Sequence, residues 1–171
     1  MSAVAIRPTA RRDAPALVAA HRASRALHGE WVTPFTDLDG FDAWFAPIEA
    51  GRKVSFLAER AGSLVGVVNL NDIVRGAFRS ATLGYYALVG SPGSGTMTEA
   101  VRLAVAEAFG PIGLHRVEAN IQPGNARSLA LVRRLGFRLE GFSPRYLFIG
   151  GAWRDHERWA LLADEAGPAA V

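Results

Sequence analysis

Helical and extended spacings of apolar residues alternate along the first part of the chain. A short extended stretch over 3–7 comes first. Apolar residues then recur at helical spacing over 10–27 and again over 37–49. These patterns predict one strand and two helices, with an irregular segment over 28–34 between the helices.

A run of extended segments follows. Residues 54–59 and 64–70 have the composition of strands, and the small residues 61–63 between them are typical of a tight turn. A third extended segment covers 80–89. Because the first two segments form a predicted hairpin and the third follows closely, we expect an antiparallel meander.

The later part of the chain alternates helices with strands. The predicted elements are a glycine-rich loop (89–95), a helix (96–109), a strand (115–121), a helix (125–135) and two strands (139–149 and 153–162) joined by Gly150 and Gly151. Thr96 and Glu99 have the spacing of a capping box at the start of the first of these helices. The whole pattern predicts one α/β domain over 1–171, a mixed sheet flanked by helices, with a frayed tail over 164–171.

Composition restricts the chemistry. The chain has 171 residues, of which 50% are apolar and 20% charged, as in an ordinary globular protein. It has no cysteine, so disulfides, thiolate metal sites and a cysteine nucleophile are excluded. Group transfer would therefore use another nucleophile or pass directly from donor to acceptor.

Charge and targeting signals point to a soluble protein with an anionic ligand. The formal charge of +3 and the pI near 9.9 suit such a ligand. The chain lacks the long runs of like charge that are typical of nucleic-acid-binding tails. We see neither a signal peptide nor an apolar stretch long enough for a membrane span, so a cytoplasmic location is expected.

The glycine-rich loop has the features of a diphosphate cradle. Gly93 and Gly95 precede a predicted helix, whose first amide groups attract anions. The loop lacks the Walker lysine, and Thr98 stands where the dinucleotide fingerprint has its last glycine. A P-loop or dinucleotide site is therefore disfavoured, and a plain glycine turn is the alternative explanation.

A second group of polar residues begins the helix predicted over 125–135. Asn125 is a favoured N-cap residue, and capping alone explains its presence. Ser128 lies in the first turn of that helix. If both helices start at the same edge of the sheet, Ser128 points toward a ligand held by the glycine loop.

These segments together resemble a known family. The residues that carry the resemblance are Gly84-Tyr85-Tyr86, Gly93-x-Gly95-x-Met97-Thr98-Glu99-Ala100, Leu114-His115-Arg116-Val117-Glu118-Ala119, Asn125-x-x-Ser128, Leu135-Gly136-Phe137-x-Leu139-Glu140-Gly141 and Trp153-Arg154-Asp155-His156. In this order they resemble the GNAT N-acetyltransferases, in the branch of the RimJ and RimL ribosomal-protein acetyltransferases. The resemblance is strong from Gly84 to Trp159 and looser before it.

The resemblance implies a GNAT fold, with a mixed and mostly antiparallel sheet, acetyl-CoA as co-substrate, no metal and direct transfer of acetyl to an amine. The implied cofactor-binding residues are Leu88, Val89, Gly93, Ser94, Gly95, Thr96, Met97 and Asn125. Ser128 would protonate the departing thiolate, with Tyr146 as the alternative acid. Arg133 and Arg134 would meet the adenosine phosphates, although arginines late in a helix are commonly solvated.

Two residues depart from the family pattern. Pro92 stands where relatives begin the loop with Gln or Arg, and Thr82 stands where they often carry an acidic residue. The identity of a general base is therefore open. The candidates, each explained more simply by a structural or solvated role, are Asp72, Glu118, His28 and His156.

The resemblance places the acceptor near His28 and Trp31, for which core packing is the alternative. An α-amine with a pKa near 7.8 is roughly one-tenth neutral at pH 7, whereas a lysine side chain near 10.4 is neutral in about one molecule in 2,500. A site without a strong base therefore suits a protein N-terminal α-amine. The alternatives are a small amine (polyamine, amino acid or antibiotic) and a catalytically decayed acyl-CoA-binding protein.

The expected partners are acetyl-CoA and an acceptor that is a ribosomal or other protein N-terminus. Neither a membrane nor a nucleic acid is expected to bind directly. Similar proteins also lead us to expect a homodimer.

Overall fold

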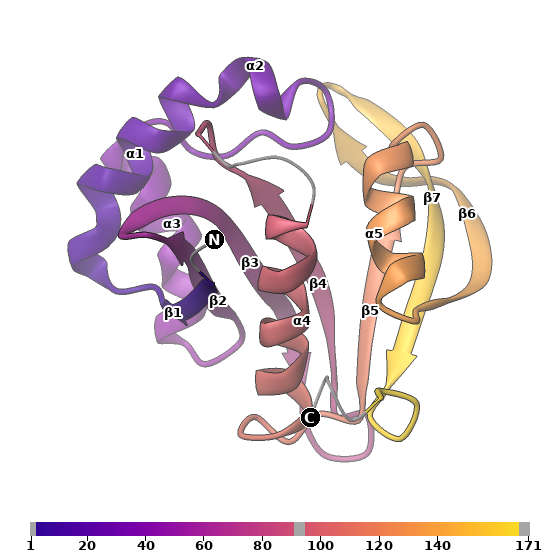
Figure 1. Ribbon diagram of the computed structural model, residues 1–171. Coiled ribbons are helices and arrows are strands. Elements are labelled where there is room, and N and C mark those ends of the chain that lie inside the picture. Colours follow the sequence, from indigo (N-terminus) through magenta and orange to yellow (C-terminus); the bar gives the residue numbers. More distant parts are fainter. Residues whose placement is uncertain (1–2, 91–94, 168–171) are drawn as a thin grey trace.

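The computed structural model describes residues 3–90 and 95–167, which form one seven-stranded sheet with helices on both faces (Figure 1). The elements are β1 (Val4–Pro8), the 3-10 turn η1 (Arg11–Asp13), α1 (Ala14–Ala23), α2 (Arg25–His28), α3 (Leu38–Glu49), β2 (Val54–Arg60), β3 (Ser63–Val74), β4 (Ser80–Ala87), α4 (Thr96–Phe109), β5 (Arg116–Ile121), α5 (Ala126–Arg134), β6 (Arg138–Ile149) and β7 (Ala152–Leu162). The strand order is β1-β2-β3-β4-β5-β7-β6. This confirms the predicted mixed α/β sheet and the antiparallel meander.

Alternation along the strands, shifted once near Val65 where the β2–β3 pairing is irregular, separates two apolar clusters. On the face covered by α4 and α5, the α4–α5 face, the buried residues include Val68, Leu83, Val117, Ala104 and Val132. On the opposite α1–α3 face they include Leu17, Phe41, Leu57, Val67 and Tyr86. Successive residues of one strand therefore serve different faces of the sheet.

The sheet opens at its centre, between β4 and β5. These neighbours run parallel and pair from Ser80 against Arg116 to Leu83 against Ala119. Beyond that point β4 pairs with β3 and β5 pairs with β7, and the two strands diverge (Figure 1). We call the region between residues 84–87 and residues 120–121 the β4–β5 gap.

The helix predicted over 10–27 is interrupted at Ser24. This residue is fully buried, and its Oγ accepts a hydrogen bond of 2.8 Å from the amide of Val89, beyond the end of β4. A serine hydroxyl that bonds to a distant backbone group offers an alternative to helix continuation. The break therefore attaches the α1–α2 segment to the end of β4.

The predicted capping box at the start of α4 is wrong. Gly95 is the N-cap, with φ at 106°, and Thr96 lies inside the first turn and is 3% exposed. Glu99 forms an ion pair of 2.8 Å with Arg102, one turn later on the same helix. The glycine supplies a left-handed cap that a threonine adopts poorly, so the N-cap is Gly95 rather than Thr96, while the helix begins at the predicted residue.

The remaining differences concern element ends. β3 continues to Val74, past its predicted end at 70, across an irregularity between Asn71 and Val74. The tail expected to fray over 164–171 is described to residue 167, and Glu165 there pairs with Arg138. Within 3–90 and 95–167, no helix combines the length and apolar character that a membrane span requires.

Candidate active site

Tyr85 and Ser128 meet beside the β4–β5 gap. Tyr85 lies on β4 just beyond its last pairing with β5, and Ser128 lies in the first turn of α5. Their hydroxyl oxygens share a hydrogen bond of 2.5 Å, and the Tyr85 hydroxyl also lies 3.4 Å from the Ser128 carbonyl oxygen. Burial raises the pKa of Tyr85 to about 12, and the hydrogen bond with Ser128 lowers it in part. The pair thus holds two protonated hydroxyl groups next to each other.

The start of α5 fixes the position of Ser128. The Asn125 side-chain oxygen accepts a hydrogen bond of 3.1 Å from the Ser128 amide, as an N-cap residue does. Asn125 therefore has the structural role that its sequence context indicated. Its contact with a cofactor remains a prediction.

The free edge of β4 supplies backbone groups to the gap. The Leu88 amide donates to the Val65 carbonyl on the β3 side at 3.0 Å. Because backbone groups alternate in direction along a strand, those of Tyr85 and Ala87 face the gap. Leu88 and Val89, the predicted cofactor-pairing residues, have amides that are bonded to Val65 and Ser24. The cofactor role of Leu88 and Val89 stays a prediction. By the alternation of backbone groups, Ala87 is the residue nearest to them whose amide is directed toward the gap.

The start of α4 lies next in the chain. Of the predicted cradle, Pro92, Gly93 and Ser94 lie outside the described residues, whereas Gly95, Thr96 and Met97 lie within them. The Met97 side chain packs on Gly66, where a Cβ would lie 2.3 Å from the Met97 sulfur. Met97 therefore anchors the first turn of α4 to β3.

Arginines from other elements reach this turn. Arg134 on α5 donates to the Thr98 hydroxyl at 3.1 Å, and Arg60 on β2 donates to the Thr96 hydroxyl at 3.3 Å. Arg133 instead lies over the Trp159 ring, 5.1 Å from its centroid. Arg134, but not Arg133, thus brings positive charge to the N-terminus of α4.

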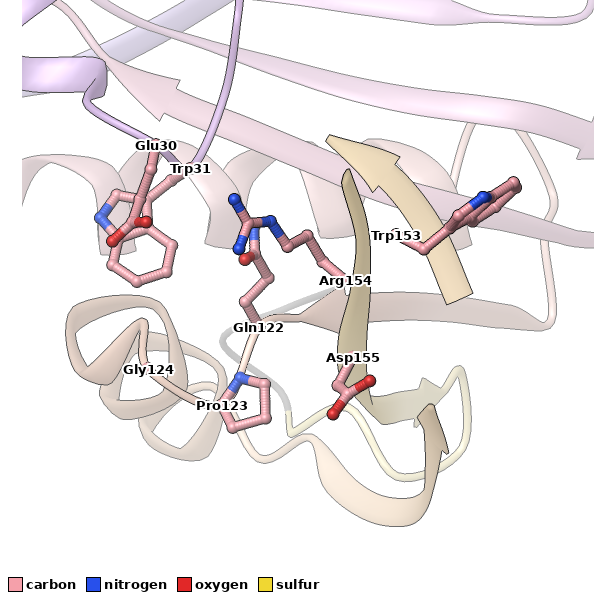
Figure 2. Close-up of a pocket in the computed structure, with 8 residues that line it drawn as sticks. All are labelled: Glu30, Trp31, Gln122, Pro123, Gly124, Trp153, Arg154 and Asp155. Atoms are coloured by element: carbon pink, nitrogen blue, oxygen red, sulfur yellow. The ribbon is translucent and has the colours of Figure 1, made fainter. Parts of the chain in front are cut away.

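A pocket of about 360 Å³ opens beyond the end of β5 (Figure 2). Its lining comes from the segment after α2, from the β5–α5 loop and from β7: Glu30, Trp31, Gln122, Pro123, Gly124, Trp153, Arg154 and Asp155. Figure 2 shows the Arg154 guanidinium directed toward Glu30 and Trp31, whereas Trp153 points away from them. The structure thus places Trp31, a predicted acceptor residue, in an open pocket with charged neighbours.

His28, the other predicted acceptor residue, does not line this pocket. It is 5% exposed, and its Nε2 donates to the Ala87 carbonyl at 2.9 Å. Its ring lies edge-on to Tyr86, at 5.2 Å between centroids. His28 therefore holds the end of β4 from the α1–α3 face, and acceptor contact by His28 remains a prediction.

The other candidate bases and the alternative acid are distributed over the molecule. His156 is 2% exposed, with its Nδ1 2.9 Å from the Arg154 carbonyl and its ring 6.0 Å from that of Tyr146. Tyr146 is 42% exposed on β6, and Asp72 is an exposed residue with a positive φ of 50°. None of these three has a described hydrogen bond to Tyr85 or Ser128.

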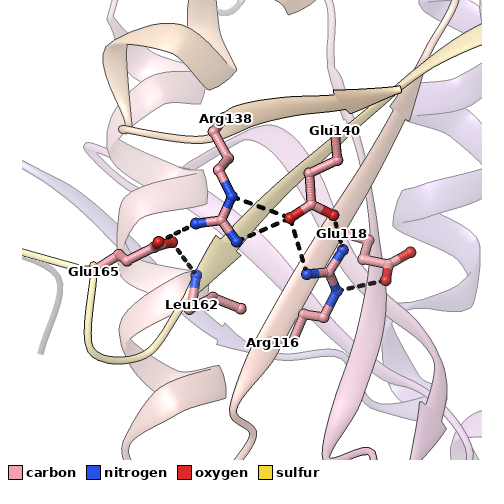
Figure 3. A network of polar contacts seen from close by, with 6 residues as sticks. All are labelled: Arg116, Glu118, Arg138, Glu140, Leu162 and Glu165. Carbon is pink, nitrogen blue, oxygen red and sulfur yellow. Dashed lines mark hydrogen bonds and ion pairs between the residues drawn. The ribbon is translucent and has the colours of Figure 1, made fainter. Parts of the chain in front are cut away.

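Glu118 belongs to a network of ion pairs across β5, β6 and the tail (Figure 3). Its carboxylate accepts a hydrogen bond of 2.6 Å from Arg116, which also pairs with Glu140. Arg116 and then Arg138 hold the pKa of Glu140 down at about 2. Glu118 on β5 is nevertheless the register partner of Thr82 on β4. Relatives often carry an acidic residue at the position of Thr82, and here the carboxylate lies on the neighbouring strand.

Sequence reasoning missed Tyr85 as a site residue. A tyrosine in an alternating strand is ordinarily a packing residue, and its neighbour Tyr86 is one. The available signal was the position of Tyr85, directly after the glycine of the Gly84-Tyr85-Tyr86 motif. Only the parting of β4 from β5 shows that this hydroxyl meets Ser128.

The fold and the site define a class of protein. A mixed sheet that opens at its central parallel strands, beside the N-terminus of a long helix, is the architecture of GNAT acetyltransferases. The Acetyltransferase (GNAT) domain model matches residues 4–138, so the chain belongs to this family. The sequence resemblance to that family is thereby confirmed.

Individual relatives agree with this assignment. The solved structure of Mycobacterium smegmatis RimJ in complex with CoA-disulfide superposes with a TM-score of 0.88 and 32% identity, over 98% of this chain and 86% of that one. The [ribosomal protein uS5]-alanine N-acetyltransferase of Escherichia coli is 40% identical over 105 residues, 61% of this chain and 54% of that protein. Escherichia coli spermidine N(1)-acetyltransferase is 29% identical over 107 residues, 61% of this chain and 53% of that protein. This chain therefore spans about half the length of these curated relatives.

Proposed function

We propose that this protein transfers the acetyl group of acetyl-CoA directly to an amine, and that the amine is a protein N-terminal α-amine. The observation that carries the proposal is the Tyr85–Ser128 pair, held at 2.5 Å beside the β4–β5 gap. The family assignment supports acetyl transfer, and the absence of cysteine supports attack by the amine without an acyl-enzyme on sulfur.

The cofactor would lie along the β4–β5 gap with its diphosphate at the start of α4. Helix N-terminal amides and Arg134 provide the positive potential that a diphosphate needs. The pantetheine arm would pair with the β4 edge at Tyr85 and Ala87, in the place of the missing strand. A backbone amide there would donate to the thioester oxygen, on which charge grows during attack.

The Tyr85–Ser128 pair would act on the leaving sulfur. As the amine nitrogen bonds to the carbonyl carbon, the C–S bond breaks and the sulfur takes the electron pair. A hydroxyl of the pair would donate a hydrogen bond to that sulfur, while the nitrogen releases its proton to solvent and the thiolate takes one from solvent. Ser128 would thus act on the sulfur as a hydrogen-bond donor, with Tyr85 as its partner, and full proton transfer from Ser128 stays a prediction.

The pocket near Trp31 would receive the acceptor. It opens next to the end of β5, and the carboxylates of Glu30 and Asp155 suit a cationic chain such as an N-terminal segment. The E. coli uS5-alanine acetyltransferase supports a protein α-amine, as does the low pKa of that group. The E. coli spermidine acetyltransferase supports a small polyamine as the second candidate. A homodimer and a cytoplasmic location stay predictions.

Release of free CoA with a panel of acceptors tests the proposal. Each peptide in the panel contains a lysine and is tested twice, once with a free N-terminus and once with an N-formylated one, so that only the lysine amine remains free. Spermidine and free amino acids complete the panel. We expect the unblocked peptides to have the highest kcat/KM, with little activity on the formylated forms. A higher kcat/KM for spermidine than for every peptide would replace the protein acceptor by a polyamine.

Thermal unfolding with acetyl-CoA tests the cofactor separately. A ligand at about 100 times its Kd adds about 2.7 kcal/mol to the free energy of unfolding, which raises Tm by several degrees. Absence of a shift would refute cofactor binding. A clear shift without CoA release for any amine would favour the decayed acyl-CoA-binding protein.

A further inference from the structure

Two asparagines hold buried oxygens that accept no hydrogen bond. Asn69 on β3 is 6% exposed, and Asn120 on β5 is half-buried. Over the part of the chain that the structure describes, the Oδ1 atoms of both are shielded from solvent and lack a hydrogen-bond partner. Buried polar atoms are nearly always paired, so two unpaired oxygens of the same kind indicate groups kept for a ligand.

Both asparagines lie in one row across the sheet, at the opening of the β4–β5 gap. Asn69 is directly opposite Gly84 on β4. The last β4–β5 pair is Leu83 with Ala119, so Gly84 and Asn120 each take the next position along their strands. Gly84 has no side chain, and a Cβ there would lie 3.1 Å from the Nδ2 of Asn71, so a side chain at this position would crowd the row.

Both side chains belong to the face opposite the Tyr85–Ser128 pair. The neighbours of Asn69, Val68 and Leu70, pack in the α4–α5 cluster, so alternation puts Asn69 on the α1–α3 face. The flanking residues Ala119 and Ile121 assign Asn120 to that face by the same rule. The asparagines and the hydroxyl pair thus flank the gap from opposite sides of the sheet.

The acceptor pocket opens onto this same face. Gln122, which lines the pocket, follows Asn120 by two residues. Arg154, also in the pocket, is four residues before Arg158, the β7 partner of Asn120, and therefore shares its face. A chain in the pocket that continues along β5 reaches Asn120 and then the gap.

We infer that Asn69 and Asn120 bind the attacking amine nitrogen of the acceptor, each accepting one of its N–H groups. This inference rests on the proposed acetyl transfer. A neutral primary amine has two N–H groups and one lone pair. With both N–H groups held by amide oxygens on the α1–α3 face, the lone pair is directed across the gap to the thioester carbon. The N–C bond then forms as the C–S bond breaks on the other side.

Leucine substitutions separate this role from a structural one. Leucine has the same number and branching of side-chain heavy atoms as asparagine and no polar atom, so Asn69→Leu and Asn120→Leu each remove an unpaired oxygen without opening a cavity. We expect an unchanged or higher Tm and unchanged stabilisation by acetyl-CoA. The kcat/KM for the best amine should fall about 10-fold for each variant, the loss of one hydrogen bond to the reacting nitrogen. Asn120→Asp, which keeps an acceptor oxygen, should retain most of the activity.

Ser55→Ala is the matched control. Ser55 lies opposite Asn69 in the same row and is 2% exposed, but its Oγ accepts a hydrogen bond of 3.1 Å from Thr9. This variant should lose stability and keep its kcat/KM, the reverse of the asparagine variants. The N-methylated form of the best acceptor has one N–H fewer, so the wild type should use it with a lower kcat/KM than the unmethylated acceptor. This difference in kcat/KM between the two acceptors should be smaller in Asn69→Leu.

Two results would overturn the inference, and they differ from failure of the proposed function. The first is that both leucine variants keep wild-type kcat/KM while acetyl-CoA still stabilises them. The second is that Asn69→Leu lowers Tm as Ser55→Ala does, which would show that its oxygen is paired in the folded protein. Failure of the wild type to bind acetyl-CoA or to acetylate any amine would instead refute the proposed function.

Discussion

Replacing Tyr85 with phenylalanine should slow acetyl transfer without weakening cofactor binding. The Tyr85 hydroxyl lies 2.5 Å from the Ser128 oxygen, and burial raises the pKa of Tyr85 to about 12. An ordinary thiol has a pKa near 8.5, so complete proton transfer from Tyr85 to a thiolate is uphill by about 3.5 pKa units, or about 5 kcal/mol. In the proposed mechanism the pair would therefore stabilise the leaving sulfur by a hydrogen bond as negative charge grows on it.

A hydrogen bond to a charged group contributes about 1.5–3 kcal/mol. This corresponds to a loss of about 10- to 150-fold in kcat/KM for Tyr85→Phe, measured by CoA release with the best acceptor. Because Tyr85 and Ser128 share one hydrogen bond, the double variant Tyr85→Phe/Ser128→Ala should lose less than the product of the two single losses. With a pKa of about 12, ionisation of Tyr85 should not lower the wild-type rate below pH 10.

Tyr86→Phe is the control for Tyr85→Phe. The Tyr86 hydroxyl donates to the Nε2 of His21 at 3.1 Å on the other face of the sheet, so this variant should lose stability rather than rate. Wild-type kcat/KM in Tyr85→Phe would remove Tyr85 from the mechanism. A fall in rate with a midpoint between pH 8 and 10 that disappears in Tyr85→Phe would contradict the raised pKa.

Two further predictions concern stability against pH. Burial lowers the pKa of Lys53 to about 8, with its Nζ 4.1 Å from the centroid of the Trp44 ring. An unfolded lysine titrates near 10.4, so above pH 8 the folded chain binds fewer protons, and the free energy of unfolding should rise by about 2 kcal/mol from pH 7.5 to 9.5. Urea titrations should show this rise in the free energy of unfolding in the wild type and not in Lys53→Met. An equal rise in both proteins would show that a group other than Lys53 causes it. The pKa of Glu140 is held at about 2 by Arg116 and Arg138, so its contribution is complete above pH 4.5 and is lost as the pH falls toward 2. Solvent screening reduces this contribution to about 1 kcal/mol. Glu140→Gln should therefore lower the free energy of unfolding by that amount at pH 7. A Glu140→Gln variant as stable as the wild type at pH 7 would contradict this prediction.

The periodic parts of the fold were predictable because each element buries one apolar face. The predicted strand over 54–59 and the predicted helix over 96–109 match β2 and α4 closely for this reason. The break at Ser24 could not be predicted, since its cause is a hydrogen bond to Val89, far along the chain. The capping box failed similarly, because Thr96 and Glu99 fit the motif while Gly95 forms the cap.

Sequence motifs pointed to some residues of the candidate site. Residues that come together only in the folded protein were missed. Ser128 and Asn125 were singled out because the start of a helix has a sequence signature, and their roles toward the cofactor stay predictions. Tyr85, Asn69 and Asn120 lie within strands and resemble ordinary packing or polar residues there. Their proposed roles depend on the parting of β4 and β5, which no local pattern encodes.

Three consecutive residues of β4 show how this parting creates a site. Gly84 faces the α1–α3 side, where a Cβ would lie 3.1 Å from the Nδ2 of Asn71 and crowd that amide. Tyr85 faces the opposite side and meets Ser128, whereas Tyr86 returns to the α1–α3 face and bonds to His21. Since the strand has a period of two, neighbouring residues necessarily contact opposite sides of the gap. One strand therefore carries a hydroxyl on one side of the gap and a residue without a side chain on the other, the two sides that the proposed direct transfer across the sheet would use.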